Sequence, residues 1–369
     1  MRVTIQAVNP EGKRRILVVS DIHGNGIYLK KLLEQAHFTS EDILIIVGDV
    51  IDKGMESLNT LQYVMGLCQS QNVYVTMGNV ELSRILLFDD DTEEGLEKFV
   101  CVVHQINKVW GGGLFDDMLR RIGLSSVMLT SENVMDYKHK IRQHFAAELD
   151  FLRSLPTILE SERYIFVHGG IPTDHLERLD LSDASAYLKN DHFLEKGYSF
   201  DKYVVVGHWP VCLYGFGEGN NPLIDYDKHI ISIDGGNALK KEGQLNLLIM
   251  PHISCDVHDI TWIYEDGYPK AKILEPQSGQ KAQVNIRWTD NKVTILQEDT
   301  DTAVIKHIST GAALTVAKSY LWNDDICEDT SDALMDVSVG DIVSVIETTK
   351  KGFIVKKDGR TGWYFGRLE

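Results

Sequence analysis

The sequence predicts an α/β domain built as a sandwich of two sheets with helices outside it (αββα), followed by a small all-β domain. Short aliphatic runs alternate with amphipathic segments from residue 16 to about residue 80. After a long segment of helical pattern, strand-like runs return at 164–167, 203–206, 230–233 and 245–250. From about residue 296 the strand candidates become short and closely spaced. A chain of 369 residues has room for one large and one small domain, each with its own core.

The first part of the chain predicts a β-α-β-α-β order. ILVVS at 16–20 and ILIIV at 43–47 lack polar alternation, which is typical of strands that are covered on both faces. Apolar residues at roughly helical spacing lie between them, a second helix is expected around 57–70, and NVYVTM at 72–77 predicts a third strand. This order implies a mostly parallel sheet with right-handed crossovers.

Residues 82–155 are largely helical in pattern, and we interpret them as a helical insertion. The insertion carries an acidic run, DDDTEE at 89–94, and a break, WGGG at 110–113. The strand-like runs that follow are interpreted as the second half of the sandwich.

The C-terminal part has a different character. GDIVSVIETTKKGFIVKKDGRTGWYFGRLE at 340–369 places turn residues between short strand candidates, as small β-barrels do. It resembles the bacterial SH3-like module in its Gly-Asp start and in its closing Gly362-Trp363. We therefore expect domains at 1–292 and 296–369, with the boundary between 287 and 300.

Composition narrows the function classes. The formal net charge of −17 argues against a broad nucleic-acid-binding surface, because phosphate-backbone binding depends on Lys and Arg. The five cysteines are scattered without a CxxC pair, which favours reduced thiols over a disulfide framework. The first residues lack an apolar signal core, and no run approaches the roughly 18 apolar residues that span a membrane. A cytoplasmic protein without a membrane partner is the expectation.

Polar motifs directly follow the predicted strands of the α/β domain. The residues concerned are Asp21, His23, Asp49, Asp52, Asn79, His168 and His208. Open α/β sheets place their sites at the carboxyl ends of strands, and neighbouring glycines permit the sharp turns that let side chains converge. Taken singly, each residue has an ordinary structural interpretation, such as a helix cap. Together and in this order they predict a site.

The ligand types predict two metal ions. Without Asp52 the set supplies three imidazoles, two carboxylates and one amide oxygen, which suits Mn, Fe or Zn better than Ca or Mg. Two such ions about 3.5–4 Å apart clamp a phosphoryl group and activate a bridging water. Asp49 is best placed by its order in the chain to bridge them.

The motifs resemble a known family. SDIHGN (20–25), GDVIDKG (48–54), GNVE (78–81), HGG (168–170) and GHWP (207–210) are similar to the ordered signature of the phosphoprotein-phosphatase branch of the calcineurin-like metallophosphoesterases. GHWP is closest to the bacterial forms, which include protein phosphatases and diadenosine tetraphosphatases. The resemblance covers about residues 14–250. It implies a first metal ion, manganese by preference, on Asp21, His23 and bridging Asp49, and a second on Asp49, Asn79, His168 and His208.

Three positions depart from that pattern. Val80 stands where the family has a histidine, which, paired with the residue equivalent to Asp52, is thought to protonate the leaving oxygen. Lys53 replaces an arginine, so a point charge stands in for a bidentate fork. The family's second phosphate-binding arginine has no clear counterpart; Arg178 is a candidate, and a surface arginine is the competing interpretation. General acid catalysis is worth a factor of about 10²–10⁴, so its loss predicts a weak enzyme toward poor leaving groups.

The proton donor itself stays open at this point. Asp52 is one candidate, if it is protonated beside the metals, and His104 and His144 of the insertion are two others. For both histidines, a structural or solvent-facing role is the competing interpretation.

The sequence therefore predicts a dinuclear phosphoesterase that hydrolyses phosphoproteins or small phosphorylated or nucleotide substrates by attack of a metal-bound water, weakened or restricted to good leaving groups. We expect Asp52 and Lys53 to act in catalysis, and Lys53, Asn79 and Arg178 to bind substrate. One alternative is a pseudophosphatase that holds metal and a phosphorylated partner without turnover. Another makes the SH3-like tail the functional part. In either case the tail is a candidate for peptide binding or self-association.

Overall fold

The computed structural model describes residues 1–10, 12–176, 179–214, 219–323 and 325–369, and these form two compact units. The N-terminal unit comprises Met1–Pro210, Pro222–Ala238 and Leu245–Glu265. The C-terminal unit comprises Val211–Asn221, Leu239–Gln244 and Asp266–Glu369. All five cysteines lie among the described residues and are thiols rather than disulfides.

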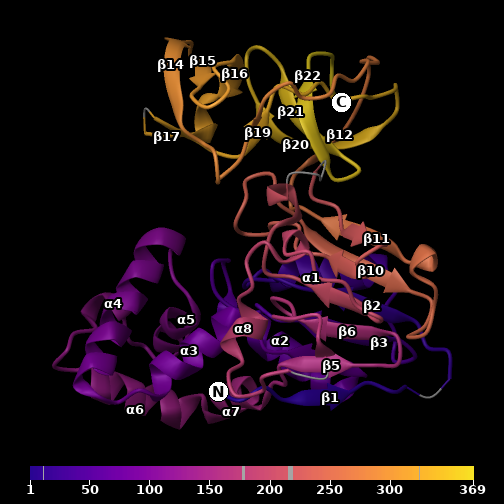
Figure 1. The fold of residues 1–369 in the computed structure, drawn as a ribbon. Coiled ribbons are helices and arrows are strands. Elements are labelled where there is room, and N and C mark those ends of the chain that lie inside the picture. The colour runs from indigo at the N-terminus through magenta and orange to yellow at the C-terminus, as the bar shows by residue number, and fades with distance from the viewer. Residues whose placement is uncertain (11, 177–178, 215–218, 324) are drawn as a thin grey trace. The chain divides into compact units, whose positions relative to one another are not determined.

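Two sheets form the N-terminal unit (Figure 1). The five-stranded sheet has the order β11 (Thr261–Glu265), β10 (Leu245–Met250), β2 (Ile16–Val19), β3 (Ile43–Val47), β4 (Val73–Thr76). The six-stranded sheet has the order β1 (Ile5–Ala7), β5 (Ile158–Glu160), β6 (Tyr164–Val167), β7 (Tyr203–Val206), β9 (Ile230–Ser232), β8 (Leu223–Asp225). Strands β2, β3 and β4 are parallel to one another, and so are β6, β7 and β9. The predicted two-sheet sandwich is confirmed, and β2, β3 and β4 are parallel as expected; both sheets are mixed, because β10, β11, β5 and β8 form antiparallel pairs.

The core lies between the two sheets. Ile45 of β3 and Leu248 of β10 belong to the same buried cluster as Phe166 of β6 and Val205 of β7. Every residue of β2 and β3 is buried, which explains why both runs are aliphatic without polar alternation. Two helices, α1 (Gly26–Gln35) and α2 (Ser57–Ser70), supply the crossovers between β2, β3 and β4.

The expected insertion is a set of helices between β4 and β5, seen apart from the sheets in Figure 1. Its elements are α3 (Asn79–Asp89), α4 (Glu93–Trp110), α5 (Leu114–Arg121), η1 (Ser126–Met128), α6 (Val134–His144) and α7 (Ala146–Ser154). Phe88, Phe99 and Phe115 form its centre, with ring centroids 4.9–6.0 Å apart. Short elements later in the unit are α8 (Ser185–Leu188), η3 (Phe193–Glu195) and η5 (Val257–Asp259). Among the described residues, no helix combines the length and apolar composition that a membrane span requires.

The C-terminal unit consists mainly of short antiparallel strands. Its larger sheets have the orders β12 (Lys270–Lys272), β20 (Ile342–Thr348), β21 (Phe353–Lys357), β22 (Arg360–Tyr364), and β14 (Val293–Glu298), β15 (Thr302–His307), β16 (Ala313–Ala317). The remaining elements are η4 (Val211–Leu213), β13 (Asn285–Ile286), η6 (Lys318–Tyr320), β17 (Leu321–Trp322), β18 (Ile326–Cys327) and β19 (Thr330–Ser331). These sheets are compatible with the expected small β domain, and the likeness to SH3 modules stays a prediction.

The boundary between the units differs from the expected position between 287 and 300. The C-terminal unit begins at Asp266, because β12 pairs antiparallel with β20 and Ile273 forms a bridge with Leu368. Two loops of the α/β sequence also belong to it; in one of them, Asn220 N donates to Gly359 O at 2.9 Å. These long-range pairings leave no signal in local composition.

Candidate metal centre

The predicted ligands occupy tight loops at the carboxyl ends of β2, β3, β4, β6 and β7. Six predicted site residues have left-handed backbone: Asp21 (φ 53°), His23 (48°), Asp49 (51°), Asp52 (62°), Lys53 (65°) and His208 (67°). This conformation is uncommon for residues other than glycine and costs of order 1–3 kcal/mol where it is strained. Six such residues in these loops indicate that the loops direct side chains into one site at some cost in backbone conformational energy.

Asp21, Asp49 and His168 form the centre of the site. One ligand atom from each lies within 4.8 Å of the others, and all three residues are buried. His168 Nε2 lies 3.4 Å from Asp49 Oδ1 and 3.1 Å from Asn79 Oδ1. His168 Nδ1 lies 2.9 Å from the carbonyl oxygen of Val47, which orients the ring so that Nε2 faces the carboxylate. This arrangement brings two carboxylates and an imidazole together at one metal centre.

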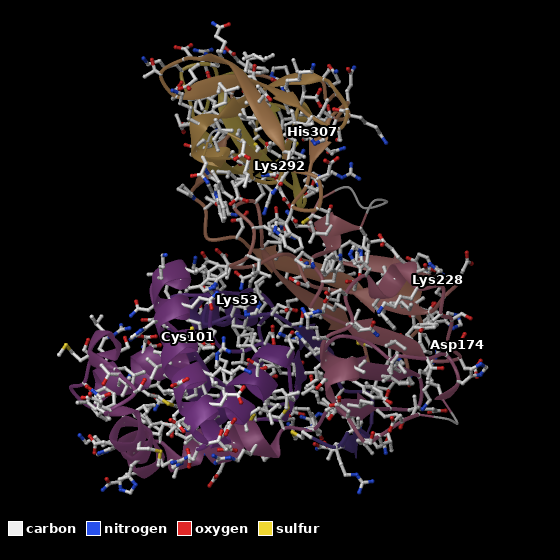
Figure 2. All side chains as sticks on the ribbon, turned by 60° about the vertical axis from the view of Figure 1, so that its left-hand side comes forward. Lys53, Cys101, Asp174, Lys228, Lys292 and His307 are labelled. Carbon is white, nitrogen blue, oxygen red and sulfur yellow. The ribbon has the colours of Figure 1, made fainter. Side chains whose placement is uncertain are left out.

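His23 reaches the same carboxylates from the other side. Its Nε2 lies 3.7 Å from Asp21 Oδ1 and 3.6 Å from Asp49 Oδ2, and its Nδ1 lies 3.3 Å from the carbonyl oxygen of Ile51. Lys53 Nζ lies 3.2 Å from His23 Nε2 and 4.0 Å from Asp49 Oδ2. Lys53 is on the loop between β3 and α2 in the N-terminal unit (Figure 2). The lysine that replaces the expected arginine therefore points into the site.

His208 completes the set of predicted imidazoles. Its ring centroid is 5.4 Å from that of His168, and its backbone N–H donates to Asp21 Oδ2 at 3.1 Å. His208 Nε2 lies 2.7 Å from Asp191 Oδ1. A carboxylate on one ring nitrogen fixes the ring and makes the other nitrogen a better ligand. Asp191 lies between α8 and η3, outside any regular element, and no motif or periodicity marks it in the sequence.

Glu81, the last residue of GNVE, holds the ligand loops together. Its Oε2 accepts the backbone N–H groups of Asp49 and Gly78, both at 2.9 Å, and its Oε1 accepts those of Val50 and Ile51 at 2.8 and 3.2 Å. The carboxylate is completely buried. One side chain thus satisfies four backbone donors and joins the loop after β3 to the start of α3. Sequence reasoning did not assign it a role.

The electrostatics of the site are those of a cation-binding pocket. Although burial opposes it, the carboxylates of Asp49 and Asp21 raise the pKa of His168 to about 10. Burial and then the charge of Lys53 lower the pKa of His23 to about 3, and burial and then the charge of His168 lower that of His208 to about 4. A proton on His168 thus compensates carboxylates that a metal ion would otherwise neutralise.

The donor set fits divalent metals. Asp21 Oδ1 is buried, and the structure gives it no hydrogen-bond partner among the described residues. A buried carboxylate oxygen without a donor is costly, whereas a cation beside it removes the penalty. Nearby, burial and then the charge of Asp21 raise the pKa of Asp234 well above its ordinary value. Carboxylate, imidazole and amide oxygen groups converge here in the combination that Mn, Fe and Zn accept.

The surroundings of Asp52 answer the question that Val80 raises. Asp52 Oδ2 accepts from Arg84 Nε at 2.5 Å, and Oδ1 accepts from the backbone N–H of Leu114 at 2.7 Å. Val80 is 4% exposed, and its backbone N–H donates to Asp49 Oδ1 at 2.9 Å. The family pattern expects a histidine at position 80 as the partner of Asp52; in this chain the side-chain partner of the Asp52 carboxylate is Arg84, one turn later in α3.

This geometry bears on the proposed proton donors. Both oxygens of Asp52 accept hydrogen bonds, one from Arg84 and one from the backbone N–H of Leu114. His104 Nε2 lies 3.0 Å from the carbonyl oxygen of Ser126, within the helical insertion. Among the described residues, neither His104 nor His144 is a partner of Asp52. Arg178, the candidate phosphate-binding residue, lies outside the described residues.

Comparison with known proteins agrees with this geometry. Residues 14–234 match the family described as calcineurin-like phosphoesterase, which is more than half of the chain. The chain belongs to the calcineurin-like phosphoesterases.

Individual relatives of this phosphoesterase carry two kinds of name. It is 23% identical over 243 residues to the symmetrical bis(5'-nucleosyl)-tetraphosphatase of Legionella pneumophila (strain Corby), covering 56% of this chain and 86% of that protein. It is 47% identical over 58 residues to serine/threonine-protein phosphatase 2 of Escherichia coli (strain K12), and this alignment covers 15% of this chain and 27% of that protein. It is 37% identical over 71 residues to the symmetrical bis(5'-nucleosyl)-tetraphosphatase of Buchnera aphidicola subsp. Baizongia pistaciae (strain Bp), and this alignment covers 19% of this chain and 25% of that protein. In the last two cases the aligned part of the phosphoesterase spans about a quarter of the relative's length.

Among solved structures, a protein serine/threonine phosphatase from Saccharomyces cerevisiae with similarity to human phosphatase PP5 matches with 12% identity and a TM-score of 0.42. That match covers 72% of this phosphoesterase and 84% of that chain.

Proposed function

We propose that this protein is a metal-dependent phosphoesterase that hydrolyses phosphate esters or anhydrides with good leaving groups. The single observation that carries the proposal is the convergence of Asp21, Asp49 and His168, all buried, with ligand atoms within 4.8 Å of one another. Buried acids without a cation would repel each other, so a retained cluster of this kind favours a functional metal site. The proposed product pair is inorganic phosphate, or a phosphorylated fragment, and a free alcohol, phenol or phosphate.

We assign the ligands as the sequence predicted. Asp21, His23 and Asp49 would hold one ion, and Asn79, His168 and His208 would hold a second together with Asp49. Divalent ions bound there supply positive charge for the phosphoryl oxygens and lower the pKa of a bound water. Manganese, iron and zinc all suit the donors, and we propose manganese for the first tests.

The remaining residues would act on the substrate. In hydrolysis a water oxygen forms a bond to phosphorus, and the bond from phosphorus to the leaving oxygen breaks, with the electron pair leaving on that oxygen. Lys53, whose Nζ lies within 4.0 Å of Asp49 Oδ2, is placed to attract a phosphoryl oxygen. Val80 offers no proton to the departing oxygen, so substrates whose leaving groups are stable as anions should react fastest.

A site without this proton donor favours aryl phosphates and phosphoanhydrides, such as dinucleoside polyphosphates, over alkyl phosphates. Relatives named as tetraphosphatases and as a protein phosphatase represent the two substrate classes to compare. Serine and threonine phosphates are alkyl esters and need a proton at the leaving oxygen, whereas tyrosine phosphate is an aryl ester.

The test is turnover by the full chain loaded with Mn²⁺. Hydrolysis of p-nitrophenyl phosphate and of diadenosine tetraphosphate should be measurable, should disappear with EDTA, and should return when Mn²⁺ is restored. Asp49→Asn should abolish it, because the change weakens the proposed bridging ligand. Arg153→Gln, which alters an ion pair at the surface of the helical insertion, is the matched control. Absence of turnover on both substrates, with metal bound, would refute the proposal.

A pseudophosphatase is the second candidate, and Val80 is the observation that favours it. It predicts tight binding of Mn²⁺ and of inorganic phosphate without turnover of any phosphate ester.

We propose that the C-terminal unit binds a peptide or a second copy of the chain, whether or not the protein is a hydrolase. If deletion of residues 266–369 left both the oligomeric state and the activity unchanged, that result would count against this proposal.

A further inference from the structure

We propose that Arg84 is a phosphate-binding residue of this site. The inference rests on the proposed function, because it assumes that a phosphoryl group enters the metal centre. Arg84 replaces in part the bidentate fork that Lys53 does not provide. It also explains how a site without a histidine at position 80 still presents a donor beside Asp52.

The contacts of Arg84 leave most of its donors available. Its Nε donates to Asp52 Oδ2 at 2.5 Å and one N–H of its NH1 group donates to Ser83 Oγ at 2.7 Å. A guanidinium has five N–H donors, so three have no partner among the described residues. The side chain is 14% exposed, so these donors are neither sealed in the core nor spread into solvent.

The direction of the side chain brings it back toward the metal ligands. Arg84 lies one helical turn after Val80, on the same face of α3. Helical side chains slant toward the N-terminus of their helix, so the guanidinium lies over the turn that begins at Asn79 and Val80. The backbone N–H of Val80 is in that turn and donates to Asp49 Oδ1.

Asp52 holds the guanidinium of Arg84 in place through their hydrogen bond. Its loop is the same one that carries Asp49, three residues earlier, and its other oxygen is held by the backbone N–H of Leu114. At Gly113 an added Cβ would meet Asp52 Oδ1 at 2.7 Å, so this glycine lets the insertion approach closely enough to hold the carboxylate. An arginine anchored by one carboxylate keeps its remaining donors in a fixed plane, the geometry in which guanidinium groups bind phosphate oxygens.

The charges of the site also favour a cation at this position. Asp49 is buried in the site, and, although burial opposes it, the charge of His168, with that of Lys53 contributing, holds its pKa below the ordinary value; its carboxylate repels a phosphate dianion where metal ions do not neutralise it. Lys53 and Arg84 are cations that lie beside carboxylates of the loop after β3, Lys53 beside Asp49 and Arg84 beside Asp52. Lys53 contributes a point charge, whereas Arg84 contributes hydrogen bonds directed to two oxygens.

The test measures binding of inorganic phosphate to the full chain loaded with Zn²⁺, by isothermal titration calorimetry and ³¹P NMR. Removing a hydrogen bond between charged groups typically weakens binding by about tenfold to a hundredfold, and we expect that loss for Arg84→Gln. Arg84→Lys should recover part of the affinity. Arg153→Gln is the matched control: Arg153 pairs with Asp89 at the far end of α3, 2.6 Å from NH2 to Oδ1, and its loss should leave phosphate affinity unchanged.

A double variant distinguishes phosphate binding by Arg84 from a purely structural role in which Arg84 only compensates the charge of Asp52. Arg84→Gln leaves a buried carboxylate without its partner, whereas Arg84→Gln with Asp52→Asn removes both charges and protects folding. If Arg84 binds phosphate, the double variant stays as weak as the single one, while Zn²⁺ affinity is retained in both. Phosphate affinity in Arg84→Gln equal to the wild type, recovery in the double variant, or no phosphate binding by the wild type would each overturn the proposal.

Turnover distinguishes this proposal from the proposed function. If phosphate binding depends on Arg84 but no ester or anhydride is hydrolysed, the binding role stands and the hydrolase function fails. If hydrolysis occurs and neither phosphate affinity nor KM for p-nitrophenyl phosphate responds to Arg84→Gln, the hydrolase function stands and the role of Arg84 fails.

Discussion

Replacing Val80 with histidine is the most direct perturbation of this site, and the structure changes its expected result. Without structural information, Val80→His should restore a general acid and with it a rate factor of about 10²–10⁴ toward poor leaving groups. That factor corresponds to about 2.7–5.4 kcal/mol of transition-state stabilisation at 1.36 kcal/mol per tenfold. A histidine acts this way only if a carboxylate orients it, and the family pattern pairs that histidine with the residue equivalent to Asp52.

Asp52 is already engaged. Arg84 Nε lies 2.5 Å from its Oδ2, with side chains that are 14% and 2% exposed. Separating a buried charge from its partner costs about 3–5 kcal/mol, which is the same size as the gain from the acid. We therefore expect Val80→His alone to change kcat toward alkyl phosphates by about tenfold or less. The double variant Val80→His with Arg84→Gln frees Asp52 for the imidazole and should raise kcat well above either single variant.

The assay compares kcat for an alkyl phosphate and for p-nitrophenyl phosphate in the wild type, both single variants and the double variant. Protonation matters for the alkyl ester, so the increase should be confined to it, while KM rises in both variants that lack Arg84. A gain of about 10²-fold or more from Val80→His alone would show that Arg84 does not hold Asp52 against the imidazole. A double variant no better than Val80→His would show that Asp52 does not orient the new histidine.

Three further predictions concern the metal ligands and their supports. The pKa of His168 is raised to about 10 without metal, so metal binding must displace its proton, and the apparent affinity for Zn²⁺ should rise about tenfold per pH unit between about pH 6 and pH 8. Calorimetry in two buffers should show that about one proton is released when Zn²⁺ binds. Release of no proton would contradict this prediction. Asp191→Asn should lower Zn²⁺ affinity about 10–100-fold through its contact with His208, and an unchanged isotherm would count against it. Gly78→Ala places a Cβ against the carboxylate of Asp49, a proposed ligand, and should lower the affinity for Zn²⁺. Gly66→Ala is the contrasting variant: its Cβ enters open space on α2, and it should raise the free energy of unfolding in urea by about 0.4–1 kcal/mol.

Local pattern was enough to predict the parts of the fold that depend on burial. The runs at 16–20 and 43–47 are aliphatic because β2 and β3 are covered on both faces, and the structure places strands there. The same logic located the ligands, since parallel strands end at one edge and the polar residues that follow them must meet. Predictions of this kind depend on residues within a few positions of each other.

The features that the sequence did not reveal depend on distant partners. The C-terminal unit begins at Asp266 because β12 pairs with β20, more than 70 residues later along the chain. Arg84 has the spacing of an ordinary helical surface residue, and only its contact with Asp52 distinguishes it. Asp191 lies in an irregular segment with no periodicity to interpret. Each required the fold to bring two separated segments together.

The Arg84–Asp52 pair suggests why the loss of the histidine is compatible with a retained site. A histidine acid serves substrates whose leaving oxygen must be protonated, whereas a fixed guanidinium stabilises oxygens that carry negative charge throughout the reaction. The leaving group of a phosphoanhydride is itself a phosphate, whose charge a guanidinium can bind and which needs no proton to depart. We infer that Val80 and Arg84 act in the same direction: both favour polyphosphate or aryl phosphate substrates over the alkyl phosphates of serine and threonine.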